Sequence, residues 1–286
     1  MMPWKSAFVP LVALGLMAVP RGPVVPAQAA ADSADIFFFE DWCLFQAELS
    51  PERQHTVSVL LTSLGTDNCA EASRRASTVT FLNLQGQALE DLTPLTAFPI
   101  LRELVLNHNN IRDLAPLAAI PGLTRLRLSH NQIADVSALQ PLTNLQVLGL
   151  SDNQVADISP LSSLENLQEL HLGNNQLSEL GAIAPLSNLT KLNLSRNQIA
   201  DLSPLESLGE LQVLDLSSNA IADVTPLATL ENLQELNLNR NLVTNPNPLR
   251  RLTRLEQIYL YNNPSESFNC SNTASTLCLI SPGDTF

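Results

Sequence analysis

The sequence predicts a right-handed α/β solenoid of horseshoe form. One parallel β-sheet is expected on the concave face, short 3₁₀ turns on the convex side, and helices over the N-terminal end. The main observation is a 22-residue pattern that recurs along residues 79–264. The second is composition: 45% of the 286 residues are hydrophobic but only 5% are aromatic, so we expect an aliphatic core. The third is that the segments flanking the repeats lack the pattern and are suited to covering the ends of the stack.

Charge and glycine content exclude several classes of function. The chain has 15 Lys and Arg against 28 Asp and Glu, which gives a net charge of −13. Nucleic acids and anionic membranes repel such a chain, so neither is expected as a partner. Only 10 glycines are present, which disfavours a glycine-rich phosphate-binding enzyme. We expect no cofactor and no metal.

Residues 1–29 have the features of a secretory signal peptide. Lys5 precedes an apolar run over 7–19, which is shorter than the roughly 20 residues of a membrane-spanning helix. Ala27, Gln28 and Ala29 then form an A-x-A cleavage pattern. We therefore expect a secreted, periplasmic or cell-surface protein with no membrane insertion after cleavage. An uncleaved membrane anchor is the alternative.

Residues 30–78 are predicted to form a helical N-terminal cap, because the end of a solenoid exposes apolar surface that must be covered. Ser50 and Pro51 match a helix N-cap followed by a first-turn proline, and Gly65 matches a helix stop. Aromatic residues precede this helix, and we expect them to be cap core rather than a ligand site. They are Phe37, Phe38, Phe39, Trp42 and Phe45.

The four cysteines predict two disulfides, Cys43–Cys69 in the N-terminal cap and Cys270–Cys278 in a C-terminal cap over residues 265–286. Nine strands spaced by about 4.8 Å separate the two ends by about 40 Å, whereas a disulfide spans Cα atoms up to about 7 Å apart. Export also favours oxidised cysteines. A metal site is the alternative, but the cysteines lack C-x-x-C spacing and a neighbouring histidine.

Eight full repeats fill 79–254, and a partial ninth extends to 264. Each contains Leu-x-Leu, which predicts a short strand with alternate side chains directed inward. An asparagine follows the strand, and its side chain is expected to bond the backbone of the next turn, so that the stacked asparagines satisfy buried amides. These residues are Asn109, Asn131, Asn153, Asn175, Asn197, Asn219, Asn241 and Asn263.

The second half of each repeat predicts one turn of 3₁₀ helix. In the repeat 189–210, Ser203 and Pro204 match an N-cap and a first-turn proline, with Leu205 and Leu208 three residues apart. Two repeats depart from this pattern: one has Ala138 in place of the proline, and the other has Gly181 in place of the cap residue and its proline displaced to Pro185. Their helical turns are therefore in question, but their strands are not.

The pattern LxxLxLxxNxIxDLxPLxxL, as in residues 189–208, resembles that of leucine-rich-repeat proteins of the 22-residue class. It is similar to the repeats of secreted bacterial internalins and of regulatory subunits of eukaryotic protein phosphatase. The resemblance covers 186 of the 286 residues. It implies a leucine-rich-repeat horseshoe that recognises another protein, and it makes adhesion a possible role.

An acidic residue also recurs once per repeat, and two explanations are open. The acids could form a cation-binding edge, or each carboxylate could accept hydrogen bonds from the backbone of the next turn. We favour the second, because a residue placed in every repeat suits architecture better than a local site. The row consists of Asp91, Asp113, Asp135, Asp157, Glu179, Asp201 and Asp223.

The binding surface is expected on the strand face, because the residues flanking each Leu-x-Leu do not repeat. One candidate patch combines Arg125 and Arg127 with His108 and His130, and its alternative is ordinary solvated charge. A second contains Tyr259, Tyr261 and Arg240, whose residue types are enriched at interface hot spots. The tyrosines could instead shield the end of the stack. His171 is a further candidate on this face.

These observations predict a non-catalytic, monomeric module that binds a protein partner of unknown identity. A carbohydrate or cell-wall binder is the alternative, although such a face would need more exposed aromatic residues than Tyr259 and Tyr261. An enzyme is the third reading and is disfavoured. An open sheet face offers no closed pocket or oxyanion hole, and residues such as Ser195, His171 and Asp215 come from different repeats.

Overall fold

The computed structural model describes residues 38–265 and the backbone of residues 277–279. The predicted signal peptide and the predicted Cys270–Cys278 bond lie outside these described parts. None of the helices within them is long and apolar enough to cross a membrane.

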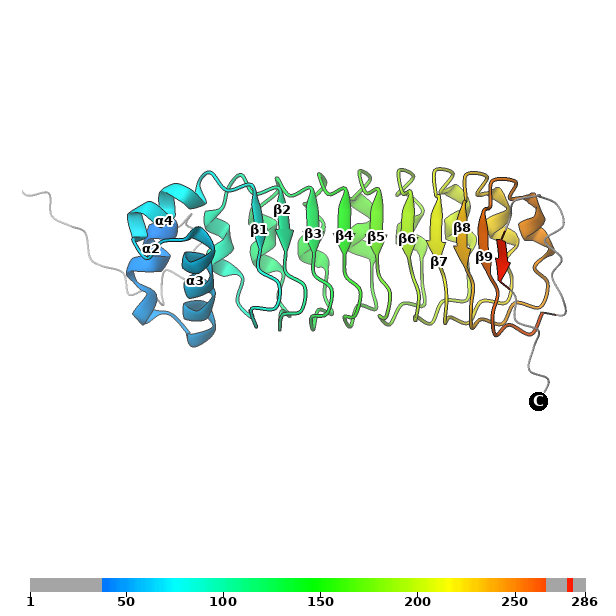
Figure 1. Cartoon of the computed structure of the whole chain (residues 1–286), viewed down its shortest axis with the longest axis horizontal. Coiled ribbons are helices and arrows are strands. Elements are labelled where there is room, and N and C mark those ends of the chain that lie inside the picture. The colour runs from blue at the N-terminus through cyan, green and yellow to red at the C-terminus, as the bar shows by residue number, and fades with distance from the viewer. Residues whose placement is uncertain (1–37, 266–276, 280–286) are drawn as a thin grey trace, which may run out of the picture. The chain divides into compact units, whose positions relative to one another are not determined.

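The repeats form one parallel sheet whose strands follow one another in chain order (Figure 1). Residues paired between the repeat strands are 22 apart in sequence, as in the pairing of Leu82 with Leu104, so one apolar row continues along the inner side. The strands are β1 (Phe81–Asn83), β2 (Glu103–Val105), β3 (Arg125–Arg127), β4 (Val147–Gly149), β5 (Glu169–His171), β6 (Lys191–Asn193), β7 (Val213–Asp215), β8 (Glu235–Asn237), β9 (Gln257–Tyr259) and β10 (Leu277–Leu279).

The strand β10 departs from the sequence-based expectation, which placed Cys278 beyond the last strand. Cys278 instead pairs with Ile258 of β9, in the same parallel sense as the repeats. The two residues are 20 apart rather than 22, so a search for the repeat period misses this strand. Pairing there satisfies backbone groups that an edge strand would otherwise leave free.

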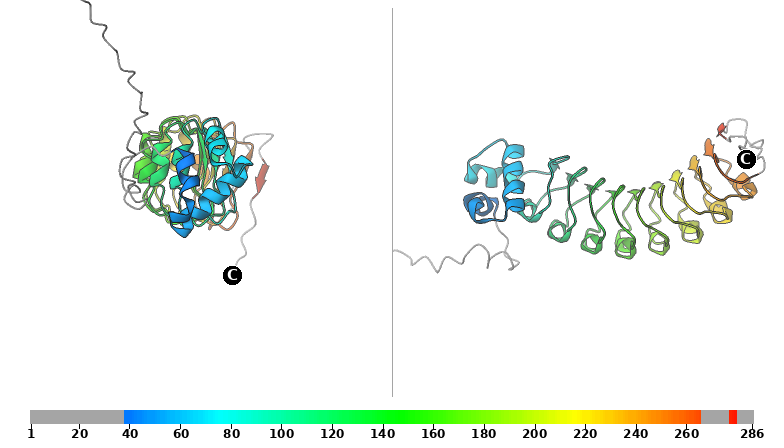
Figure 2. Two further views of the ribbon diagram at one scale, coloured as in Figure 1. Left: turned by 90° about the vertical axis from the view of Figure 1, so that its left-hand side faces the viewer. Right: turned by 90° about the horizontal axis from the view of Figure 1, so that it is seen from below.

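Short 3₁₀ helices occupy the other side of the repeats, so that the curved sheet has its strands on the concave side and these helices on the convex side (Figure 2). This arrangement confirms the predicted solenoid. The helices are η2 (Thr93–Ala97), η3 (Ala115–Ala119), η4 (Ser137–Leu139), η5 (Ser159–Ser163), η6 (Gly181–Ile183), η7 (Ser203–Ser207), η8 (Thr225–Thr229) and η9 (Asn247–Arg251).

The two irregular repeats keep their helical turns but shorten them. Both η4 and η6 have 3 residues, whereas η7 and the other 3₁₀ helices of the repeats have 5. Their prolines lie later in the repeat, at Pro141 and Pro185, and no longer fix φ in the first turn. Ala138 packs partly buried against the core, so the apolar side of the turn is retained.

The cap of these turns differs from the prediction. The N-cap position of η7 is Leu202, and Ser203 is its first residue rather than its cap. The Asp201 carboxylate accepts hydrogen bonds from the Ser203 amide at 2.9 Å and from its hydroxyl at 2.6 Å. A carboxylate accepts stronger, charge-assisted hydrogen bonds than a hydroxyl, which explains why the aspartate takes the capping role.

The repeated asparagines connect successive repeats. Asn131 Nδ2 donates to the carbonyls of Leu106 at 3.0 Å and Leu128 at 2.9 Å, while its Oδ1 accepts from the Ile111 amide at 3.0 Å. Two of these partners belong to the preceding repeat and one to its own. The same donor contacts recur at every asparagine of the row from Asn109 to Asn263. Each bridge satisfies backbone groups that the bends leave inside the protein.

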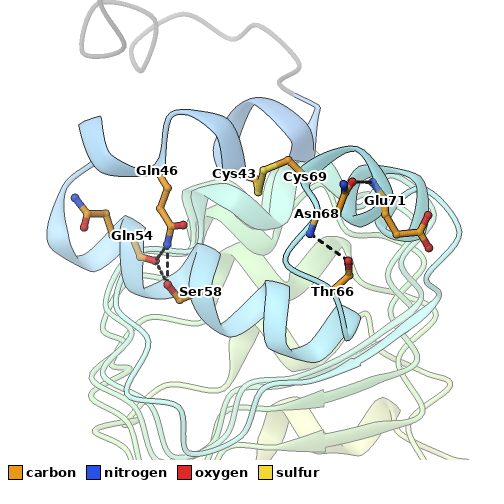
Figure 3. Close-up of a disulfide and its surroundings, with 8 residues drawn as sticks. All are labelled: Cys43, Gln46, Gln54, Ser58, Thr66, Asn68, Cys69 and Glu71. Carbon is orange, nitrogen blue, oxygen red and sulfur yellow. Dashed lines mark hydrogen bonds between the residues drawn. A yellow bond between two sulfur atoms is a disulfide. The ribbon is translucent and has the colours of Figure 1, made fainter.

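Helices cover the N-terminal end of the sheet: α2 (Phe39–Leu44), η1 (Gln46–Glu48), α3 (Pro51–Leu64) and α4 (Cys69–Ala76). The Ser50 hydroxyl accepts from the Arg53 amide at the start of α3, and Gly65 ends this helix with a φ of 67°. The disulfide between Cys43 and Cys69 joins α2 to the start of α4 (Figure 3).

The aromatic cluster of the cap is only partly a core. Phe39 and Trp42 are buried, and the Phe39 ring packs edge-on against Phe98 of the first repeat at 5.7 Å. Phe38 and Phe45, in contrast, are 71% and 44% exposed. The reason is geometric: Phe39 and Trp42 are three apart on one face of α2, whereas Phe38 and Phe45 flank its ends. Phe37 lies outside the described residues.

Candidate recognition face

We define the strand face as the outward residues of β1 to β9, two from each strand. The central residue of each strand is directed inward and buried, from Leu82 in β1 to Ile258 in β9. The outward positions are mostly half-buried or exposed, and their chemistry changes from strand to strand. Folding therefore fixes the inward row and leaves the strand face available for contacts.

The arginine patch of the strand face comprises Arg125 and Arg127 of β3. Arg127 Nη1 lies 3.4 Å from Glu103 Oε1 on the neighbouring strand. Arg125 is exposed and has no carboxylate within 4.0 Å among residues 38–265. Two strands away, on β5, Glu169 Oε1 lies 3.0 Å from Lys191 Nζ of β6, and this hydrogen bond lowers the pKa of the Glu169 carboxyl. Both nearby acids thus pair with another cation, and the positive charge of Arg125 also lowers the pKa of the Glu169 carboxyl.

His171 faces the arginine patch from β5. Burial lowers the pKa of its imidazole, an effect that Glu169, 3.9 Å away, opposes only in part. The ring is therefore mainly neutral at neutral pH. In that form it is a hydrogen-bonding group rather than a fixed charge.

A shallow hollow of about 200 Å³ lies between β3 and β5, above the outward side of β4. Val147 and Gly149, both buried, are among the residues that line it. Residues around it include Arg127, Ser129, Glu169 and His171.

His108 and His130 contact each other in the turns that follow β2 and β3. Their rings stack at 4.1 Å with an angle of 10° between planes. Both residues have φ of 57°, and His130 Nε2 lies 3.4 Å from Asp152 Oδ2 in the next repeat. No hydrogen bond or ion pair within residues 38–265 joins them to Arg125 or Arg127. The structure thus brings the two histidines together, and the four-residue patch stays a prediction.

The tyrosine patch lies near the C-terminal end of the repeats. Tyr259 is an outward residue of β9, and its hydroxyl donates to Gln257 Oε1 at 2.8 Å. Tyr261 lies beyond the strand and is 47% exposed. The backbone amide of Arg240 donates a hydrogen bond to the Tyr261 carbonyl, so these two candidates lie side by side in successive repeats. The backbone of β10 continues the sheet past Tyr259.

Comparison with known proteins agrees with this architecture. The family described as "Leucine Rich repeats (2 copies)" matches residues 99–141, 143–185 and 187–229. The crystal structure of internalin C2 from Listeria monocytogenes is 33% identical, with a TM-score of 0.68, over 71% of this chain and 91% of that one. The chain belongs to the internalin-like leucine-rich-repeat proteins. None of the curated proteins matches it.

More distant solved structures share these leucine-rich repeats. A leucine-rich-repeat protein of Leptospira interrogans is 29% identical, with a TM-score of 0.64, over 68% of this chain and 52% of that one. The ectodomain of the receptor kinase GASSHO1/SCHENGEN3 from Arabidopsis thaliana is 27% identical, with a TM-score of 0.57, over 64% and 24%. Leucine-rich-repeat proteins mediate protein–protein recognition.

The acidic row of this leucine-rich-repeat protein caps its 3₁₀ turns. Hydrogen bonds from the following Ser or Thr hydroxyl and backbone amide lower the pKa values of Asp135, Asp157, Asp201 and Asp223. Glu179 precedes the irregular turn η6 and makes no such bond among the described residues. No three His, Cys, Asp or Glu side chains in this part of the chain are placed to share a metal ion.

A second row of asparagines was missed by sequence reasoning. Each donates from Nδ2 to a carbonyl 23 residues earlier, as Asn144 does to Pro121 at 3.0 Å. Their spacing could have revealed them, but Gly122 and Glu210 interrupt the row in other leucine-rich repeats of the chain. The row consists of Asn144, Asn166, Asn188 and Asn232.

Proposed function

We propose that this protein is an exported, non-catalytic module that binds a protein partner through its strand face. The observation that carries the proposal is the contrast within each strand. The inward residue is always apolar, whereas the outward residues change from Glu103 to Arg125 to Val147 to Glu169 along the sheet. A surface that served the fold alone would have no reason to vary while its other side stays constant.

The complexes formed by similar proteins support a protein or peptide as the ligand. The GASSHO1/SCHENGEN3 ectodomain was solved in complex with CASPARIAN STRIP INTEGRITY FACTOR 2. The receptor kinase HAESA, 26% identical with a TM-score of 0.57, was solved with the peptide hormone IDA and the co-receptor SERK1. Export is supported by the signal-like residues 1–29 and by the disulfide Cys43–Cys69, a bond that persists in oxidising compartments.

Two groups of residues supply the anchors in this proposal. Arg125 and Arg127 form charge-assisted contacts at one part of the strand face. Tyr259 and Tyr261, with Arg240, provide large amphipathic contacts nearer the C-terminal end. His171 lines the hollow next to Arg127, and the stacked His108 and His130 add hydrogen-bonding capacity beyond the ends of β2 and β3.

The experiment is capture of surface and extracellular proteins from the producing organism and its surroundings on the immobilised protein. Wild type is compared with Arg125→Glu/Arg127→Glu, with Tyr259→Ala/Tyr261→Ala, and with the matched control Arg250→Glu/Arg251→Glu on the convex helix η9. We expect a protein captured by wild type and by the control but lost from at least one strand-face variant.

Capture that is identical for all four proteins would contradict the strand-face proposal. Wild-type binding to polysaccharide or cell-wall material instead, lost in the tyrosine variant, would favour the carbohydrate alternative. Export is tested separately by sequencing the N-terminus of the protein recovered outside the cell, where a start near Ala30 is expected.

A further inference from the structure

Gly149 is a glycine that the fold does not require. It lies at an outward position of β4 and is absent from the residues with positive φ. A Cβ atom added there would meet Ser129 Oγ at 3.5 Å and the Arg127 Cα at 3.7 Å, which are ordinary van der Waals contacts. An alanine would fit, and the equivalent positions of the neighbouring strands carry Arg127 and His171.

Glycine is otherwise a poor choice at this position. It loses more backbone entropy on folding than any other residue and contributes no side-chain packing to a strand. In strand interiors it often marks a bulge, a tight bend, or a place where a ligand or another backbone approaches closely. The regular pairing of β4 with β3 and β5 shows neither a bulge nor a bend at Gly149. Here Gly149 is one of the residues that line the 200 Å³ hollow, and the apolar side chain of Val147 lies beside it.

The charges around the hollow favour an anion. Arg127 lines the hollow on one side, and Arg125 lies outside the lining, next to Val147 on the neighbouring strand. On the other side, Lys191 lies beyond Glu169. Arg127 pairs with Glu103 and Lys191 with Glu169, and the positive charge of Arg125 also lowers the pKa of the Glu169 carboxyl, so the three cations exceed the two acids by one charge. This local excess of positive charge occurs in a chain of net charge −13, which would repel an acidic partner elsewhere.

We infer that the hollow above Gly149 receives an Asp or Glu side chain from a projecting segment of the partner protein. Its aliphatic part contacts Val147, and its carboxylate accepts hydrogen bonds from the arginine patch in the geometry that guanidinium groups favour. Neutral His171 closes the other side of the hollow as a hydrogen-bonding group. The inference rests on the proposed function and specifies the chemistry of its partner.

The probe is a library of random linear peptides displayed on phage and selected on the purified protein. Enriched peptides are synthesised, and each acidic residue in them is replaced by its amide. Affinities are then measured for wild type, Gly149→Phe, Arg125→Ala and Gly149→Ala. Gly209→Phe is the matched control, since Gly209 has no atom within 4 Å of an added Cβ and lies outside the strand face.

We expect one acidic residue in each selected peptide whose amide replacement weakens binding about tenfold or more, as loss of a charge-assisted hydrogen bond does. Gly149→Phe should weaken binding at least as much by filling the hollow, and Arg125→Ala should also weaken it. Gly149→Ala and Gly209→Phe should stay within about threefold of wild type, below the effect of one lost hydrogen bond.

The inference is overturned if no peptide is enriched, if amide replacement has no effect, or if Gly149→Phe binds as wild type does. If the peptides no longer bind Tyr259→Ala/Tyr261→Ala but bind Gly149→Phe as they bind wild type, the hollow is not their binding site. The proposed strand-face function would still hold. Peptides whose affinity is unchanged by every strand-face variant would contradict both the hollow and the strand-face function. Equal melting temperatures of Gly149→Phe and Gly209→Phe show that a loss of binding is not a loss of folding.

Discussion

The inward and outward residues of one strand experience opposite constraints although they are adjacent in sequence. In β7, Leu214 is 1% exposed, and its equivalents along the sheet are all Leu or Ile. Val213 and Asp215 on either side are half-buried, and their equivalents include acids, bases, amides and aromatic residues. The inward row therefore specifies the fold, and the outward row is available for recognition. Along each strand of the solenoid, residues that specify the fold therefore alternate with residues that are available for binding.

The largest expected effect comes from the inward row. Leu214→Ala should lower the free energy of unfolding by about 3 kcal/mol, because it removes buried methyl groups and leaves a cavity between two repeats. Val213→Ala, one residue away, should cost less than about 1 kcal/mol because its side chain is already partly in water. Urea denaturation of both variants measures the difference, and similar losses would contradict the separation of the two rows.

The two asparagine rows give a second contrast, between a buried and an exposed bridge of the same chemistry. Asn131→Ala should cost about 2 kcal/mol, because the Ile111 amide and the Leu106 and Leu128 carbonyls lose their partner away from water. Asn144→Ala removes one exposed bond to Pro121, whose carbonyl can bond water instead, and should cost about 0.5 kcal/mol. The same denaturation experiment checks this order, and a larger cost for Asn144 would contradict it.

Features that repeat could be predicted from the sequence. The strands, the bridging by Asn131 and its equivalents, and the turns near Pro204 follow from a 22-residue period. Features that break the period could not. Cys278 joins the sheet at a spacing of 20 residues, and Glu210 interrupts the second asparagine row.

The candidate site was predicted less completely than the fold, because a site depends on which neighbours meet across strands. Sequence spacing placed Arg125 and Arg127 on the strand face and grouped them with His108 and His130, but the stacking of the two histidine rings became visible only in the structure. The sequence alone did not identify Gly149 as a site residue. Its meaning depends on the residues that surround it from β3 and β5.

The capping aspartates predict an acid sensitivity. Hydrogen bonds from Ser203 hold the pKa of Asp201 below its unfolded-state value, so its stabilising contribution is present above that value and is lost as the pH falls through the folded pKa. The free energy of unfolding should therefore decrease below about pH 4, where carboxylates of ordinary pKa begin to protonate. Asp135 and Asp157 act in the same direction.

A triple variant tests this cause. Ser137→Ala/Ser159→Ala/Ser203→Ala removes the hydroxyl donors and should make the decrease between pH 5 and pH 3 shallower by bringing the three pKa values closer to those of the unfolded chain. Ser207→Ala is the control, since its hydroxyl bonds the Ala184 carbonyl and no carboxylate. An unchanged pH dependence in the triple variant would assign the acid sensitivity to other groups.

The smallest expected change in the free energy of unfolding comes from substitutions in the arginine patch. Arg125 is exposed without a carboxylate partner in the described chain, and the Arg127–Glu103 pair is long at 3.4 Å and partly solvated. Such pairs contribute little, so Arg125→Ala/Arg127→Ala should change the free energy of unfolding by no more than about 0.5 kcal/mol. A variant that loses binding while keeping its stability would place the function of these arginines outside the fold. A loss of several kcal/mol, measured by the same urea titration, would show instead that the outward row supports the solenoid and that its variation has a structural origin.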